Sequence, residues 1–370
     1  MYTHERVTLS VVAEAIADLK GAKFAGPYDN AKSYSGNVFF VPDDTLMPEE
    51  ASCLGICLPT DLFGAVVPYP FAKTKAITHR LVDPSADRPE GWSSAFSEMV
   101  EHVVLPGYTV FSVDDARAAA ARLLNSGAIR IKEPLAAGGV GHTVATTIDE
   151  FEAFLDAFPE ASIAAHGLVV ESNLRDVTTV SIGQITIDDM TITYHGKQRV
   201  ATNNAGCRVY GGSALVCVRG GWEALARLPM PRTVRLAAAQ AKVYEGAMCE
   251  YPGFMVSRRN YDVAQGLDGT GCRRSGVLEA SWRSGGASTA ELAALREFAQ
   301  DPSLHVVEAS TVKLFGRAHE APPNAVVHYR GDDPEDGPIA RYTMVTRKLK
   351  RYDSDCYRRH AARLETTLAF

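Results

Sequence analysis

One stretch constrains this chain most, because it joins an alternating strand pattern to a glycine-rich loop. The run Ile129-Arg130-Ile131-Lys132 places the two basic side chains on one face of a strand and the two isoleucines on the other. Pro134 ends the strand, and residues 136–142, with the sequence Ala-Ala-Gly-Gly-Val-Gly-His, follow. Backbone N–H groups of such a loop can surround an anion, and a strand lysine adds a positive charge there. The pattern therefore predicts a triphosphate-binding site in an ATP-using enzyme.

Composition excludes several other classes of protein. The chain has 370 residues, of which 46% are hydrophobic and 22% charged, which is typical of a soluble globular protein with two or three subdomains. Its net charge of −6, without a long basic block, argues against nucleic acid as a partner. No apolar run approaches the ~20 residues needed to span a bilayer, and the first residues lack the form of a signal peptide. We therefore expect a cytoplasmic protein without a membrane partner. The seven cysteines have no zinc-type spacing, which predicts free thiols.

Periodicity divides the chain into four predicted segments: 1–105, 106–176, 177–330 and a C-terminal tail, 331–370. Apolar residues at helical spacing predict helices at 10–19, 114–124, 148–158, 233–244 and 291–299. Strands are predicted at 37–41, 65–67, 109–111, 129–132 and 167–171, in an antiparallel group from 180 to 194, and at 261–264 and 276–281. Asp188-Asp189 is the predicted turn within the antiparallel group, and Asp268 to Gly271 is the predicted turn between the last two strands.

The order of these features resembles the ATP-grasp superfamily, and in particular its biotin carboxylase, aminoimidazole ribonucleotide carboxylase and carboxylate–amine ligase branch. The resemblance covers about residues 70 to 290. It implies a mixed α/β and α+β fold: an N-terminal α/β (pre-ATP-grasp) domain, an A subdomain with the glycine-loop lid, and a B subdomain with an antiparallel sheet. The chain also resembles a bacterial family known only as a domain of unknown function.

The resemblance implies a set of nucleotide-binding residues. Lys132 corresponds to the family's phosphate-binding strand lysine, and Gly138, Gly139 and Gly141 to its flexible lid. Lys75, with Lys73 as second choice, corresponds to the lysine at the entry to the grasp unit. Glu171, at a strand end, would hold the ribose or the adenine amino group, and Leu174 in the hinge would offer its backbone N–H.

The resemblance also implies a metal site and a catalytic arginine. In the family, an acid on one strand is followed by a Glu-x-Asn-x-Arg signature on the next. Here Asp262 is the first acid, and Glu279, Ser281 and Arg283 fill the signature, with serine in place of asparagine. Mg²⁺, or Mn²⁺, would bind these oxygen atoms together with phosphate. Arg283 would face the transferring phosphate as a catalytic residue together with Lys132.

Two further arginines are candidates for an acidic substrate. Arg208 lies in a loop where relatives place acceptor-facing residues, and Arg258 precedes the strand of Asp262. For Arg208 the alternative is a solvated loop side chain. The segment 195–199 is placed near the nucleotide by position alone.

The implied function is an ATP-dependent ligase. A small-molecule carboxylate is activated as an acyl phosphate, with release of ADP, and an amine or other nucleophile then displaces phosphate. Alternatives are a bicarbonate-activating carboxylase and a non-catalytic ATP- or ligand-binding module, which Ser281 favours. A dinucleotide oxidoreductase is disfavoured because no Gly-x-Gly-x-x-Gly follows the first strand. Relatives of this kind are commonly homodimers, but the sequence shows no interface stripe and leaves the oligomeric state open.

Overall fold

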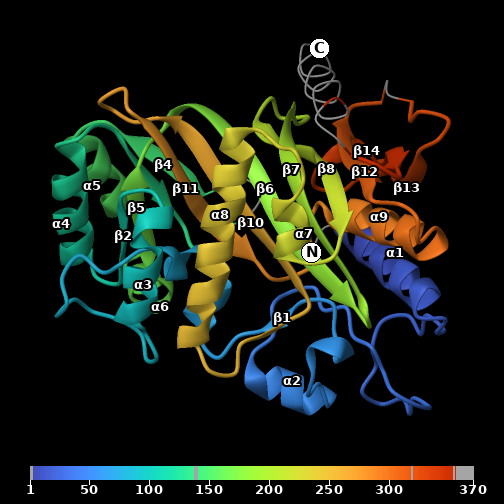
Figure 1. The fold of residues 1–370 in the computed structure, drawn as a ribbon. Helices are drawn as coiled ribbons and strands as arrows, with labels where there is room; N and C mark the ends of the chain where they lie inside the picture. The colour runs from blue at the N-terminus through green and yellow to red at the C-terminus, as the bar shows by residue number, and fades with distance from the viewer. Residues whose placement is uncertain (1–2, 137–140, 318–319, 353–354, 356–370) are drawn as a thin grey trace.

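The computed structural model describes residues 3–136, 141–317, 320–352 and 355, and the predicted lid residues Gly138 and Gly139 lie outside these ranges. The described chain forms one long antiparallel sheet, a small lobe with its own sheet, and an N-terminal segment that connects them (Figure 1). None of its described helices combines the length and the apolar character that crossing a membrane requires.

The long sheet has eight strands in the order β11-β10-β6-β7-β8-β12-β14-β13, all antiparallel. Their bounds are β6 (Arg175–Ile187), β7 (Met190–Thr202), β8 (Arg208–Arg219), β10 (Arg258–Leu267), β11 (Arg273–Ser281), β12 (Val306–Phe315), β13 (Val326–Asp333) and β14 (Gly337–Leu349). The turn predicted at Asp188-Asp189 joins β6 to β7, with Asp188 in the left-handed region at φ 52°. A short aspartate tolerates this conformation better than most side chains do.

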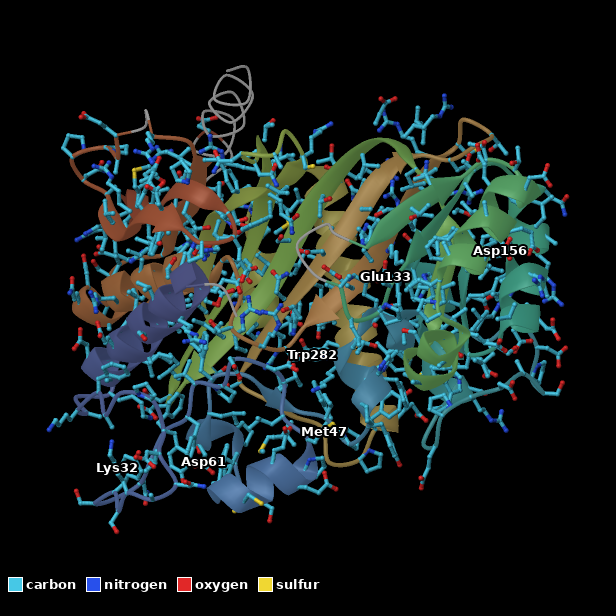
Figure 2. All side chains as sticks on the ribbon, turned by 180° about the vertical axis from the view of Figure 1, so that it is seen from behind. Lys32, Met47, Asp61, Glu133, Asp156 and Trp282 are labelled. Atoms are coloured by element: carbon cyan, nitrogen blue, oxygen red, sulfur yellow. The ribbon has the colours of Figure 1, made fainter. Side chains whose placement is uncertain are left out.

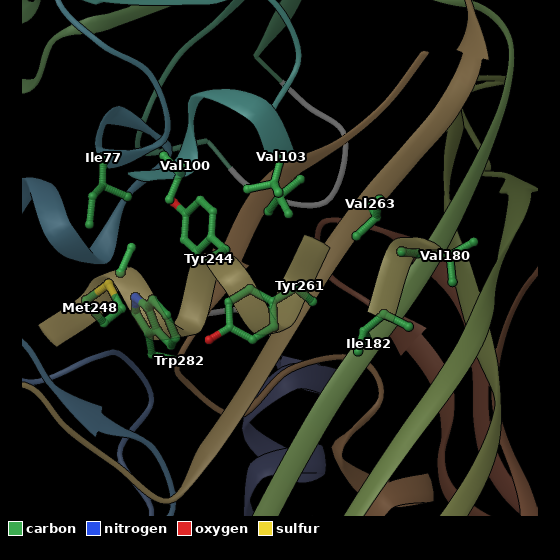
Figure 3. Packing of buried hydrophobic residues seen from close by; sticks show 14 of the residues in the cluster. Ile77, Val100, Val103, Val180, Ile182, Tyr244, Met248, Tyr261, Val263 and Trp282 are labelled. Carbon is green, nitrogen blue, oxygen red and sulfur yellow. The ribbon is translucent and has the colours of Figure 1, made fainter. Parts of the chain in front are cut away.

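The two faces of this sheet bury different helices. On one face α8 (Arg232–Ala247) contributes Tyr244 to a core with Tyr261 and Trp282 (Figure 3). On the other, α1 (Thr3–Leu19) and α9 (Ser288–Gln300) pack on residues such as Ile185 and Tyr194. In Figure 1, α8 crosses the near face, and α1 and α9 lie together at the right. The alternation of apolar residues in each strand therefore supplies two cores, one for each face.

The small lobe has a four-stranded sheet in the order β2-β5-β3-β4. Its strands are β2 (Gly107–Val110), β3 (Ile129–Lys132), β4 (His142–Ala145) and β5 (Leu168–Ser172), and its helices are α4 (Val113–Leu124), α5 (Ile148–Ala157) and α6 (Glu160–His166). Ile129 and Ile131 enter the core under α4 and α5, as the alternation predicts. Both of these helices begin at hydroxyl caps: Ser112 accepts from the Asp115 N–H, and Thr147 from the Glu150 N–H.

The N-terminal segment links the two parts. It contains α2 (Pro48–Leu54), α3 (Ser94–Val100) and β1 (Ala65–Val66), which pairs with β9 (Met255–Val256). A 3₁₀ turn at Lys75–Thr78 presses against the small lobe, since Thr109 donates its hydroxyl to the Ala76 carbonyl at 2.7 Å. One further short helix, α7 (Trp222–Ala226), follows β8.

Several predicted elements differ from the structure. Residues 37–41 are not a strand, and Phe40 alone makes a bridge to Leu62. The helix predicted at 10–19 begins at Thr3, and α4 has its C-cap at Asn125, not Gly127. The strands predicted between 180 and 187 are one continuous strand that begins at Arg175. No element was predicted in the last fifty residues, where β13 and β14 lie. The division into four segments stays a prediction, and β13 crosses its boundary at residue 330.

Candidate functional site

Lys132 and Glu171 form a buried ion pair on the face of the small sheet that is turned away from α4 and α5. Lys132 Nζ lies 2.6 Å from Glu171 Oε1, and each side chain is 1% exposed. His79 Nε2 lies 3.0 Å from the other oxygen, Oε2. Lys132 lies on β3 and Glu171 on the neighbouring strand β5, while His79 follows the Lys75–Thr78 turn. The three side chains therefore tie the N-terminal segment to the small lobe.

The charge of Glu171 is stabilised inside the protein. Burial alone would raise the pKa of this carboxyl group, but the positive charge of Lys132 and the hydrogen bond with His79 lower it to about 2. Glu171 is therefore ionised at neutral pH, and both its oxygens have protein partners. Its predicted contact with a nucleoside stays a prediction.

Cationic side chains gather beside this pair. Lys75 is almost fully buried and donates to the Ala136 carbonyl at the start of the predicted lid. Among the described residues, none forms a hydrogen bond with the buried Nε2 atom of His142, at the end of the lid. Burial, followed by the charges of Lys132, Lys75 and Arg130, lowers the pKa of His142 to about 4. The imidazole is thus neutral at pH 7, and the cations around it favour an anion at this place.

Two carboxylates of the long sheet face this cluster. Asp262 on β10 and Glu279 on β11 are directly opposed in the register. A β-bulge between Asp262 and Val263 makes Leu278 the extra residue of β11. Bulged residues share one side of a sheet, so Leu278 and Glu279 both lie on the face of Asp262. Glu279 Oε2 is 3.3 Å from the Nζ atom of Lys75, whose turn in the N-terminal segment packs against the small lobe, so the acids lie beside these cations.

Asp262 is held by a set of neutral donors. Gln198 Nε2 donates to Oδ2 at 2.7 Å, while Ser181 Oγ and Asn260 Nδ2 each donate to Oδ1 at 2.9 Å. Burial, and then the charge of Glu279, raise the pKa of Asp262. A cation between the two carboxylates would relieve this penalty, because it supplies the positive charge that the donors lack.

This arrangement suits a hard divalent ion that is shared with a ligand. Within the described part of the chain, no group of three or more His, Cys, Asp or Glu side chains is placed to hold a metal. Mg²⁺ is commonly bound by one or two carboxylates, with substrate phosphates and water completing its octahedron. The pair of Asp262 and Glu279 fits that pattern.

An apolar patch lies next to the acids. Leu105, Leu174, Ala264 and Leu278 pack together. Leu174 lies in the short link between β5 and β6, which is the predicted hinge, and Leu278 precedes Glu279. A flat aromatic base needs an apolar surface. Leu105, Leu174 and Ala264 are buried, so the half-buried Leu278, one residue before the acid that faces the cations, is the member that offers one. Figure 2 marks Glu133, at the end of β3, where the small lobe faces the long strands.

Other predicted site residues have different surroundings. Arg258 is 2% exposed and donates to Glu291 at 2.8 and 3.2 Å, as well as to the Arg283 carbonyl at 2.6 Å. Its guanidinium thus anchors α9 to the end of β11. The Ser281 hydroxyl accepts from the same arginine at 3.3 Å. Arg283 is 40% exposed, with Nε 4.0 Å from Asp44. Arg208 is exposed at the start of β8.

Sequence reasoning did not single out His79 or Ser181. His79 lies four residues after Lys75 in a segment without regular periodicity. Its role as a partner of Glu171 is visible only in the structure, where its ring lies close to Gly107 and Glu171. Ser181 is one hydroxyl among many strand residues. Its register opposite Asp262 could be recognised only after β6 and β10 were paired.

Comparisons with known proteins agree with this fold. The sequence model of the family described as "Protein of unknown function (DUF3182)" matches residues 1–343. No curated protein matches the sequence. Among solved structures, phosphoribosylamine–glycine ligase from Thermotoga maritima is 13% identical, with a TM-score of 0.52 over 98% of this chain and 93% of the other. This likeness confirms the ATP-grasp fold.

Two further solved structures are similar at lower scores. Carboxyaminoimidazole ribonucleotide synthase from Aspergillus clavatus, complexed with ATP, is 11% identical, with a TM-score of 0.49 over 97% of this chain and 95% of the other. N5-carboxyaminoimidazole synthetase from Staphylococcus aureus, complexed with ADP, is 12% identical, with a TM-score of 0.43 over 74% and 69%.

Proposed function

We propose that this chain, which belongs to the DUF3182 family of proteins of unknown function, is an ATP-dependent ligase that activates a small-molecule carboxylate. The carboxylate would attack the γ-phosphorus of ATP, giving an acyl phosphate and ADP, and an amine or another nucleophile would then displace phosphate. The ligase class is in keeping with the ATP-grasp fold, and the reaction itself is inferred from the site.

One observation carries the proposal: a lysine of the N-terminal segment, next to the cations of the small lobe, meets the paired acids of the long sheet. Lys75 spans this junction, with its Nζ 3.3 Å from Glu279, and Lys132 and His142 lie beside it. A polyphosphate needs positive charge on one side, and a divalent ion bound to carboxylates needs negative charge on the other. The junction supplies both within one small region.

The residues of this chain would divide the work as follows. Lys75 and Lys132 would neutralise phosphate charge, and Asp262 and Glu279 would hold Mg²⁺. When bound, Mg²⁺ would withdraw charge from the phosphate oxygens during transfer. Glu171 would act as a positioning residue, because its two oxygens orient Lys132 and His79. The apolar patch around Leu174 and Leu278 would accept the adenine.

The remaining predicted residues have different roles in the proposal. Gly141 has φ +68°, and a side chain there would collide with Ala136, so a glycine suits the end of a loop that closes over phosphates. Arg283 is proposed to face the transferring phosphate or the substrate carboxylate, because it is 40% exposed and follows the strand of Glu279. Arg258 is assigned a structural role, and Arg208 stays a candidate for substrate contact.

The test combines nucleotide binding with turnover. Wild-type protein should bind MgADP in calorimetry and should release ADP from ATP with a mixture of carboxylates and amines. Glu279→Gln should lower turnover at least about 100-fold, because it removes a charge that acts on the transferring group. Glu160→Gln, an exposed change on α6, is the matched control. Absence of heat with MgADP, or equal turnover in Glu279→Gln, would refute the proposal.

A second candidate function is favoured by one observation. The Ser281 hydroxyl, which stands where the family has a metal-binding asparagine, is engaged by Arg258 at 3.3 Å. A site with one ligand fewer suits a binding module without catalysis. Tight MgATP binding without turnover, whichever acceptor is added, would support the module over the ligase.

A further inference from the structure

Arg341 is a half-buried cation that has no partner within the part of the chain that the structure describes. It lies on β14, opposite Lys313 of β12. Among residues 3–136, 141–317, 320–352 and 355, none forms a hydrogen bond or an ion pair with its guanidinium. Burial, the largest cause, lowers the pKa of Arg341, yet an arginine stays charged in proteins. A desolvated charge of this kind costs stability unless an anion reaches it.

The guanidinium lines a small cavity of about 10 Å³. Hydroxyl groups surround the cavity: Tyr210 shares a hydrogen bond of 2.7 Å with Ser213, and Thr289 one of 2.6 Å with Thr343. Gly286, just before α9, also lines it, and a side chain there would collide with the Tyr210 ring. Hydroxyls and a helix N-terminus both favour an anionic group. The cavity is partly open and has room for about one water-sized group, so only the end of a ligand can reach the guanidinium.

The other charged groups near the cavity are already compensated. Lys313 pairs with Asp336 at 2.6 Å. Burial, and then Arg341, lower the pKa of His328 to about 4, so it is neutral at pH 7. The charges of Glu5 and Asp336 raise the pKa of Arg341, but neither carboxylate is close enough to form an ion pair with it. Arg341 is therefore the cavity-lining charge that awaits a counter-ion.

A row of polar residues leads from the cavity to the acids of the active site. Gln198, Ser213, Thr311 and Thr343 follow one another in register across β7, β8, β12 and β14. Gln198 donates to Asp262 at 2.7 Å. The Tyr210 hydroxyl shares hydrogen bonds with Ser213 and Thr311 of this row. Burial chiefly raises the pKa of Tyr210, while the charge of Arg341 lowers it and that of Asp262 raises it. The cavity thus belongs to the same face of the sheet as the proposed catalytic centre.

We propose that Arg341 binds an anionic group, a carboxylate or a phosphate, at the far end of the substrate that this enzyme activates. The inference rests on the proposed function and specifies its substrate class. Four strands lie between β10 and β14, so the bound group is distinct from the carboxylate that reacts beside Glu279. The substrate is therefore an extended acid with a second anionic group.

The test uses inorganic phosphate and glutarate as probes, with and without MgADP. Each is titrated into wild-type protein, Arg341→Met, Arg341→Lys and the matched surface control Arg317→Met, whose guanidinium pairs with Asp332 on the exterior. Wild type and Arg317→Met should bind at least one probe saturably and gain thermal stability from it. Arg341→Met should bind it at least tenfold more weakly, with an unchanged affinity for MgADP.

The outcomes separate the two proposals. Arg341→Lys should keep more affinity for phosphate than for glutarate, because a lysine cannot form the bidentate pair, and the preferred probe identifies the anionic group. Equal probe binding in wild type and Arg341→Met, or no saturable binding to wild type, overturns the inference while MgADP binding leaves the proposed function intact. If probe binding depends on Arg341 but the protein does not bind MgADP, the anion site is supported and the ATP-dependent ligase is refuted.

Discussion

The buried trio of Lys132, Glu171 and His79 shows how single residues prepare this site. A lysine with 1% exposure is tolerable because a carboxylate lies 2.6 Å away. Breaking such a pair costs much more than the pair contributes over two apolar residues, because one charge is left buried alone. The trio therefore acts as a fixed support for the amino group that the proposal directs at phosphate.

Replacing Glu171 by glutamine is expected to destabilise the protein by about 3 kcal/mol at pH 7. The amide keeps the shape of the side chain but leaves Lys132 without a counter-charge. Urea unfolding followed by circular dichroism measures the loss, and Glu160→Gln on the surface of α6 serves as the control. A Glu171→Gln midpoint equal to that of the control would contradict this account of the pair.

The same variant has a defined pH dependence. The pKa of Glu171 is lowered from 4.5 to about 2, so the folded state favours the ionised form. The stabilisation is fully present above about pH 4.5 and is lost as the pH falls towards 2. The difference in stability between wild type and Glu171→Gln should therefore shrink over this range, as Glu171 itself becomes neutral. A difference that stays constant from pH 7 to pH 3 would show that the charge is not its source.

At the scale of elements, the β-bulge in β11 is the decisive device. A regular strand would turn Leu278 and Glu279 to opposite faces. The bulge brings both to the face of Asp262, so one strand offers an apolar contact and an acid side by side. The register between β10 and β11 thus places the proposed adenine and metal contacts next to each other.

Leu278→Ala is expected to weaken MgADP binding roughly tenfold, since it removes about 1–2 kcal/mol of apolar contact. Glu279 keeps its register, so the metal site should persist. Calorimetry with MgADP measures the change, and Leu314→Ala on β12, with a similarly half-buried side chain, is the control. If Leu278→Ala bound MgADP as tightly as wild type did, the patch would not be the adenine site.

At the scale of the whole molecule, the last strands complete the long sheet and do not form an appendage. β14 lies between β12 and β13, and Tyr352 beyond it enters the core of α8. The late part of the chain also carries Arg341 to the face of the active site. Stability and the proposed substrate site therefore depend on the same strand.

Removing residues 337–370 should prevent cooperative folding. The truncation takes away the shared partner of β12 and β13 and leaves an edge of unpaired backbone groups. Thermal unfolding and size-exclusion chromatography of the truncated and full chains test this expectation. A truncated protein that is monomeric and melts cooperatively near the temperature of the full chain would show that β14 is dispensable.

Much of the candidate site could be predicted from short patterns. The alternation around Lys132, the strand that ends at Glu171 and the hairpin that carries Asp262 and Glu279 are local features, and the structure contains each of them. The prediction was poorest where residues meet without a local signal. The irregular segment that holds His79 has no hydrophobic period. In strand β14 the alternation of apolar and polar residues is weak, because basic and hydroxyl residues occupy many of its positions.

Local chemistry along the chain was enough to specify many of the strands, the turns at Asp188 and Asp268 and the types of charge near a phosphate, because these depend on neighbours a few residues apart. The partners of those charges were decided by folding. His79 reaches Glu171 across 92 positions, and Arg258 turns inward to Glu291 instead of toward a ligand. Arg341 lines a cavity shared by several strands and α9 and has no partner among the described residues. Such outcomes depend on burial and on strand order, which no window of sequence contains.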